Sequence, residues 1–203
     1  MKFDQEAAKR AGSMGLQTGA AIGVVSAVKV VAGTGTHGVQ FAIETDAGAK
    51  AQYINVYYKK ADGSYIESGK NTIIAMMGLL KLQEVPLDDL PHEAPIREFT
   101  NVRLGLVLQK VHYTKNDQSD GYKFDIRLPF SAQTRKTYTE AVENKPATFV
   151  DLYCENLEDK DERVTHMPTQ AEREANGGWG ASQQQAKPQY NEPPMDFDDD
   201  ILF

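Results

Sequence analysis

Residues 20–43 read AAIGVVSAVKVVAGTGTHGVQFAI, and this stretch decides the fold. Its first half, Ala20–Ala32, is rich in Val and Ala, which is typical of a long strand. The glycines at Gly33 and Gly35 then predict a turn. After the turn, large apolar residues occupy every second position over Val39–Ile43, and a period of two half-buries a strand. The stretch therefore predicts two neighbouring strands joined by a glycine-rich turn.

The β pattern continues downstream as far as the first helix. Residues Ala51–Lys60 predict a third strand. Asp62-Gly63 is a strong turn signal that would lead into a short returning strand at Ser64–Glu67. From Asn71 to Leu82, large apolar residues recur at helical spacing. We therefore expect a strand, a small hairpin and a helix over this part of the chain.

A proline-rich connection and a long hairpin come next. The prolines at Pro86, Pro91 and Pro95 exclude regular structure between the helix and the following strand. Two further strands, Val102–Thr114 and Tyr122–Phe130, flank a polar loop. We expect these two strands to pair as a hairpin.

The chain after the hairpin predicts a helix at Gln133–Asn144 and a last strand at Thr148–Cys154. The element order is then three strands, a helix, two strands, and an appended helix and strand. An OB fold has this order, and in its five-stranded barrel the helix between the third and fourth strands caps the barrel. The sequence therefore predicts a β-rich domain with one or two helices, built as an OB-type barrel.

Charge is unevenly distributed along the chain. The formal net charge is −7, and residues Asp151–Phe203 carry 13 acidic and 4 basic side chains, so the remainder is weakly basic. From about Val164 the chain is rich in Gln, Glu, Gly and Pro, a composition that cannot bury enough apolar surface to fold. We expect a binding domain at residues 1–157 and a disordered acidic tail at residues 158–203.

Cysteine content and hydropathy bear on the compartment. The only cysteine is Cys154, so no intramolecular disulfide can form. Residues Met1–Lys9 lack the apolar run of a signal peptide, and no stretch approaches the roughly 20 apolar residues that span a bilayer. These features predict a soluble, cytoplasmic protein with no membrane partner.

The chain ends in PPMDFDDDILF, residues 193–203. Such a segment offers a terminal aromatic ring to an apolar pocket, an α-carboxylate to a nearby Arg or Lys, and aspartates to a basic rim. It resembles the acidic tip of bacterial-type single-stranded DNA-binding proteins, although Leu202 stands where that tip usually has Pro. The binding domain is similar in element order to divergent domains that phages encode, which implies the cytoplasm of a host cell. The residues expected to bind partner proteins are Asp198, Asp199, Asp200, Ile201, Leu202 and Phe203.

The resemblance implies binding of single-stranded DNA without sequence preference, and partners from DNA replication, recombination and repair. Such binding requires a positive groove for phosphates and aromatic faces on which bases stack. On the third strand, Tyr53, Tyr57 and Lys59 fall on the face opposite Ile54 and Val56, which makes them the first choice. The full candidate set is Lys29, Tyr53, Tyr57, Lys59, Arg103, Tyr113, Lys115, Tyr122, Lys123 and Arg127.

Other motifs in the sequence point to different chemistry, but the residues around them do not meet the requirements of those motifs. Gly33–Gly38 fits the dinucleotide pattern G-x-G-x-x-G, but a strand pattern and not a helix pattern follows it. If Asp120-Gly121 belonged to a calcium loop, Arg127 would stand where a bidentate Glu is required. The histidines are scattered, and one cysteine offers no metal-ligand pair. We therefore expect a protein that is not an enzyme and that uses no metal or cofactor.

Two other functions remain open. A strand-annealing or recombination-mediator protein would use the same groove but would promote pairing of complementary strands. A protein of another class would be an acidic-tailed adaptor whose β domain binds protein and not DNA. Salt-dependent retention on single-stranded DNA separates the adaptor from the other two.

Overall fold

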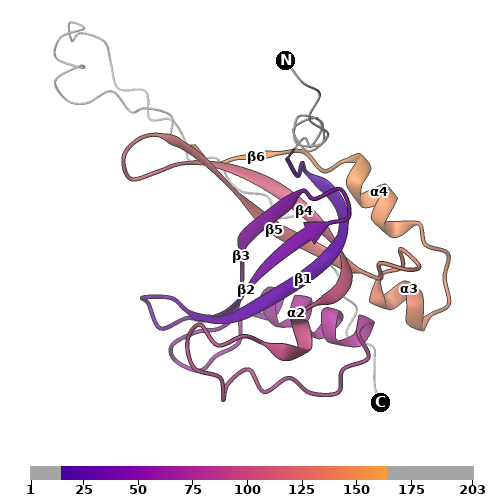
Figure 1. Cartoon of the computed structure of the whole chain (residues 1–203), viewed down its shortest axis with the longest axis horizontal. Coiled ribbons are helices and arrows are strands. Elements are labelled where there is room, and N and C mark those ends of the chain that lie inside the picture. The colour runs from indigo at the N-terminus through magenta and orange to yellow at the C-terminus, as the bar shows by residue number, and fades with distance from the viewer. Residues whose placement is uncertain (1–14, 164–203) are drawn as a thin grey trace, which may run out of the picture. The chain divides into compact units, whose positions relative to one another are not determined.

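The computed structural model describes residues 15–163, which form a mixed β-sheet with a few short helices (Figure 1). The prediction of a β-rich domain is therefore confirmed. The strands in this part of the chain are β1 Gly19–Val31, β2 His37–Thr45, β3 Lys50–Lys59, β4 Val102–Thr114, β5 Asp120–Phe130 and β6 Lys160–Asp161. The helices are α2 Glu67–Leu79, the 3-10 helix η1 Arg97–Phe99, α3 Tyr138–Val142 and α4 Phe149–Glu155.

The main sheet follows the strand order β3-β2-β1-β4-β5, with neighbours antiparallel, and β6 pairs with β4 in parallel. β1 serves two partners, because Gly19–Val25 pairs with β4 while Gly23–Val31 pairs with β2. Figure 1 shows β1 as a long, curved strand. The two ends of the order, β3 and β5, approach each other with Cα atoms within 8 Å. The sheet is therefore strongly curled.

The core lies between the inner face of the curled sheet and α2. Alternate residues of β1, β2, β3 and β4 are buried there, together with Ile73 and Met76 of α2. The helix lies very close to β3, since a Cβ built at Gly69 would stand 1.9 Å from the carbonyl oxygen of Tyr57. Glycine at this position therefore permits the contact between α2 and β3.

α2 begins at Glu67, one turn earlier than the apolar spacing predicts. The predicted returning strand is reduced to a single bridge between Lys59 and Tyr65. Asp62 explains the short reversal, because its carboxylate accepts hydrogen bonds from the backbone N–H (2.8 Å) and the hydroxyl (2.6 Å) of Ser64. The chain thus turns from β3 into the helix within a few residues.

The proline-rich connection lies along the part of β1 that β4 leaves unpaired. The backbone N–H of Ile96 donates to the carbonyl of Ala27 (2.9 Å). Lys29 donates its backbone N–H to Ala94 (2.8 Å) and accepts a hydrogen bond from Glu93 (2.8 Å). These bonds satisfy backbone groups that a strand edge would otherwise expose.

The predicted strand at Thr148–Cys154 is wrong, because these residues enter helix α4. The carboxylate of Glu140 accepts hydrogen bonds from the backbone N–H groups of Thr148 (2.9 Å) and Phe149 (2.8 Å), at the start of α4. It also closes a capping box with Thr137 at the start of α3, which is shorter than the helix predicted there. Burial disfavours the charged form of Glu140, but these hydrogen bonds outweigh burial and lower its pKa to about 2.

The described chain continues past the boundary placed at residue 157. Residues 158–163 include β6, which pairs with Val111 and His112 of β4. The predicted tail beyond residue 163, with its tip Asp198–Phe203, lies outside the described residues. Within residues 15–163, no helix is both long and apolar enough to cross a membrane.

Candidate nucleic-acid interface

The outer face of β1, β2 and β3 carries a groove. Two hollows of about 470 Å³ and about 210 Å³ lie on this face. They share Ser26, Ala42 and Gln52, so they form one continuous surface, called the β1–β3 groove below. Small side chains from β1 and β2 keep the floor of the groove low. Polar side chains in its lining include Gln40, Glu44, Asp46, Lys50, Gln52 and Tyr53.

A β-bulge presents Tyr53 in the groove. The register of β3 on β2 shifts between Phe41 and Ile43. As a result, the neighbours Gln52 and Tyr53 both lie on the exposed side, opposite Ala42. Tyr53 adopts a left-handed backbone with φ of 60°, and its side chain is 72% exposed. A β-bulge changes the direction of a side chain, and a non-glycine residue with positive φ carries backbone strain. The bulge therefore directs the ring of Tyr53 outward at a conformational cost.

Tyr57 is the second aromatic residue of this face. Its ring lies against the backbone of β2, since a Cβ at Gly38 would stand 2.8 Å from the ring atom Cδ1. The ring is 37% exposed. Beside it, Gln40 Nε2 donates a hydrogen bond to Asn55 Oδ1 across the two strands (3.0 Å). Together with Tyr53, this residue gives β3 two accessible rings on one face, as the alternation predicts.

Three cations in or beside the groove are each paired with a carboxylate. The pairs are Lys50 with Glu44 (2.9 Å), Lys59 with Asp88 (2.8 Å) and Arg103 with Asp46 (2.7 Å). The hydrogen bond from Lys59 lowers the pKa of Asp88. The hydrogen bonds from Arg103 likewise lower the pKa of Asp46. Asp46 and Asp88 are therefore charged at neutral pH, and each of the three cations already has a carboxylate partner.

The assignment of Lys29 to the binding surface is corrected by its burial. Lys29 lies on the inward side of β1, where it is 1% exposed, and its Nζ donates a hydrogen bond to the hydroxyl of Tyr58. Tyr58 in turn donates to Asp88 Oδ1 (3.1 Å). Burial lowers the pKa of Lys29, and burial together with Asp88 raises the pKa of Tyr58. Lys29 is an internal polar residue that no phosphate can reach.

The remaining candidates lie on the β4–β5 hairpin, whose distal part is called the hairpin arm below. β4 loses its pairing with β1 after Leu108, and the arm extends beyond β1–β3 (Figure 1). Tyr122 is 59% exposed on the arm, packs edge-on against Phe124, and has Lys110 Nζ 4.6 Å from its ring centroid. Arg127 is exposed at the base of the arm, where the register of β5 on β4 shifts opposite Val107 and Leu108. The arm thus combines an aromatic ring with basic side chains.

The tip of the arm carries Tyr113 and Lys115. Both pack around Gly121, where a Cβ would stand 2.9 Å from Lys115 Cε and 3.0 Å from Tyr113 Cζ. Lys123 lies on the same arm with its ammonium 3.8 Å from the carboxylate of Glu162. The ten predicted residues therefore fall into an internal lysine, a groove set and an arm set.

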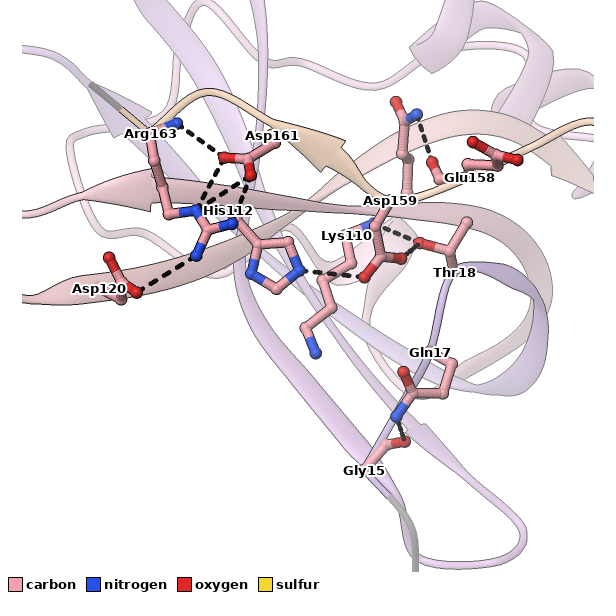
Figure 2. Close-up of polar contacts among 11 residues, drawn as sticks. Gly15, Gln17, Thr18, Lys110, His112, Asp120, Glu158, Asp159, Asp161 and Arg163 are labelled. Atoms are coloured by element: carbon pink, nitrogen blue, oxygen red, sulfur yellow. Dashed lines mark hydrogen bonds and ion pairs between the residues drawn. The ribbon is translucent and has the colours of Figure 1, made fainter. Parts of the chain in front are cut away.

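Figure 2 shows how the last described residues are held against the arm. Asp159 accepts a hydrogen bond from the hydroxyl of Thr18 (2.5 Å) and lies 3.0 Å from Nε2 of His112. These two contacts lower the pKa of Asp159. Arg163 reaches the carboxylate of Asp120 at the start of β5 (3.3 Å). The segment that leads into the tail is therefore anchored on β4 and β5.

Sequence reasoning missed Gln40, Gln52 and the acidic residues of the groove. Gln40 and Gln52 occupy outward positions of β2 and β3, and strand alternation is a signal that identifies such positions, as it did for Asn55. Asp88 gives no such signal, because a proline-rich connection does not reveal which strand it will meet.

Comparisons of this chain with protein-family models, curated proteins and solved structures found no match. The geometry of residues 15–163 and the sequence of the tail therefore carry the functional argument.

Proposed function

We propose that this protein binds single-stranded DNA without sequence preference, along the β1–β3 groove. The observation that carries the proposal is the display of two accessible tyrosines, Tyr53 and Tyr57, on one face of β3 beside a groove with polar lining. Aromatic rings on a sheet face support stacking of bases of any sequence, and each stacked base contributes roughly 1–3 kcal/mol.

The strand arrangement supports an OB-type barrel as the scaffold. The order β3-β2-β1-β4-β5, with β3 approaching β5, is what a five-stranded barrel closed between its third and fifth strands requires. α2 follows β3 and precedes β4 in the chain, which is the place of the capping helix in that fold. In OB folds the face of the second and third strands binds oligonucleotides, and the β1–β3 groove lies on these strands here.

The hairpin arm extends the proposed binding surface. Tyr122 offers a further exposed ring, and Lys110, Lys115 and Arg127 supply positive charge for phosphates. OB folds use the loop between their fourth and fifth strands in this way. A strand that stacks on the groove would gain electrostatic contacts on the arm.

We propose further that the tip Asp198–Phe203 recruits proteins of DNA replication, recombination or repair in the cytoplasm. The support is its sequence of three aspartates followed by Ile, Leu and Phe, which offers aspartates to a basic rim and apolar side chains to a pocket on a partner protein.

The test is a fluorescence-anisotropy titration of a labelled poly-dT oligonucleotide and of a duplex of equal length. We expect preference for the single strand, and we expect Tyr53→Ala and Tyr57→Ala each to weaken binding by about tenfold, the equivalent of about 1.4 kcal/mol of lost stacking. Phe149→Ala is the matched control, since Phe149 is 48% exposed on α4 away from the groove.

Two outcomes would count against the proposal. Equal losses in all three variants would place the binding site elsewhere, and failure of the intact chain to bind single strands would favour the adaptor function. Deleting residues 196–203 should leave single-strand binding at least as tight, because the acidic tip is proposed to bind proteins and not DNA.

A further inference from the structure

Three carboxylates are paired with cations in or beside the β1–β3 groove, where Glu44 and Asp46 line the groove and Asp88 lies in a separate hollow next to Lys59. They come from three separate segments: Glu44 from β2, Asp46 from the turn after it, and Asp88 from the proline-rich connection. Each lies within 2.9 Å of its cation. Each of the three cations is thus paired with one carboxylate, so the three pairs carry no net charge.

Each of the three carboxylate–cation pairs has a specific geometry. Asp46 binds both terminal nitrogens of Arg103, which is the fork geometry that fits a phosphate equally well. Asp88 accepts one hydrogen bond from Lys59 and a second from Tyr58, which in turn accepts one from Lys29. Glu44 stands directly opposite Lys50 in the β2–β3 register. The carboxylates are thus fixed by strand register and by a buried network.

The same pairs are open to solvent, with the side chains of Glu44, Asp46 and Asp88 at least half-exposed. Exposed ion pairs contribute little to stability, and solvent can reach them. A phosphate that approaches must therefore compete with a carboxylate already in place, and it releases fewer counterions than it would at an unpaired cation. Contact with the sugar-phosphate backbone alone gains little here.

We propose that Glu44, Asp46 and Asp88 make the groove selective for single strands over duplex. The inference rests on the function proposed above. A single strand presents bases to Tyr53 and Tyr57, so stacking compensates for the weak phosphate contacts. A duplex keeps its bases stacked internally and offers mainly phosphates, whose attraction the three carboxylates offset. The carboxylates lower the affinity for both forms, and they lower it more for duplex.

The test compares the intact chain with the variant Glu44→Gln/Asp46→Asn/Asp88→Asn, by anisotropy titration of poly-dT and of duplex over a series of salt concentrations. We expect duplex affinity to rise at least tenfold and single-strand affinity to rise by about threefold, so selectivity falls. The slope of log affinity against log salt should steepen by up to about 2 for single strands, at about 0.7 per newly engaged phosphate.

The matched control for the double variant Glu44→Gln/Asp46→Asn is Glu143→Gln/Asp151→Asn. It removes the same number of charges and frees Lys145 and Arg135, whose partners lie at α3 and on α4. Equal changes in variant and control would overturn the inference, because net charge alone would then explain them. Glu44→Gln/Asp46→Asn leaves the Asp88 network intact, and it should give a smaller shift of the same sign if the triple variant is destabilised.

The inference and the proposed function fail in distinguishable ways. If the intact chain prefers single strands and the triple variant keeps the same selectivity, the carboxylates have no selective role while the groove remains the binding site. If the intact chain binds neither form, the function itself is wrong, and the inference falls with it.

Discussion

Lys29 lies on the buried side of β1, and its environment explains why. It shares the inward positions of that strand with Val25 and Ala27. A lysine there requires partners, because an isolated buried ammonium is strongly disfavoured. The hydroxyl of Tyr58 supplies a hydrogen-bond acceptor, and the ring of Tyr58 lies 4.6 Å from the Lys29 ammonium. Lys29 therefore contributes to the stability of the folded domain.

We predict that Lys29→Ala lowers the free energy of unfolding by about 2–4 kcal/mol, because it leaves a cavity and removes one of the two hydrogen-bond partners of the Tyr58 hydroxyl. Affinity for poly-dT should change less than twofold. Urea denaturation and anisotropy titration measure the two effects. Lys123→Ala on the exposed arm is the control, with an expected stability change within about 0.5 kcal/mol. A variant of Lys29 that keeps its stability but loses DNA binding would reverse this assignment.

Single residues of the candidate site were predictable where strand alternation holds. The period of two places Tyr53 and Tyr57 outward, and both are exposed. The same rule, applied from Val25 and Ala27, puts Lys29 inward, but its charge favoured an outward assignment. The bulge at Tyr53 has no sequence signal of the usual kind, because no glycine marks it.

Helices α3 and α4 depend on one carboxylate. Glu140 caps the first turn of α3 and accepts two backbone hydrogen bonds from the start of α4, so a single side chain fixes both elements. Because its pKa falls from an ordinary 4.5 to about 2 in the folded state, folding favours the charged form. The stability that it contributes is fully present above about pH 4.5 and is lost as the pH falls toward about 2.

We predict that Glu140→Gln lowers the free energy of unfolding at pH 7 by about 1–3 kcal/mol, the usual effect of weakening hydrogen bonds to a charged group. Between about pH 4.5 and 2 the variant should lose less additional stability than the intact protein. Denaturant titrations at a series of pH values measure both effects. Glu143→Gln removes an exposed carboxylate of the same segment, and a matching loss in this control would contradict the special role of Glu140.

Elements were predictable from the sequence where a local pattern decides the structure. The hairpin strands Val102–Thr114 and Tyr122–Phe130 show strong alternation, and β4 and β5 agree with them. The segment Thr148–Cys154 is short and apolar, a pattern that strands and helices share. Its helical state is set by a distant carboxylate, Glu140, and local propensity does not reveal such a contact.

At the scale of the whole domain, the described surface combines the β1–β3 groove with the hairpin arm. Aromatic rings and paired cations lie in and beside the groove, while the arm carries the exposed ring of Tyr122 with basic side chains. A single strand that spans both would stack on the first and bind through its phosphates to the second. From the sequence we predicted a positive groove. The pairing of its cations was not predictable, because counting charges cannot reveal that Asp88 meets Lys59 from a distant part of the chain.

The central claim, that bases stack on the tyrosines of β3, is tested most directly by photo-cross-linking. A poly-dT oligonucleotide with scattered 5-iododeoxyuridine couples on irradiation to aromatic rings in contact with the base, and mass spectrometry of the digested protein identifies the residues. We predict cross-links at Tyr53 and Tyr57, with further cross-links at Tyr122. Cross-links confined to aromatic residues outside the groove and the arm, such as Phe149, would contradict the account.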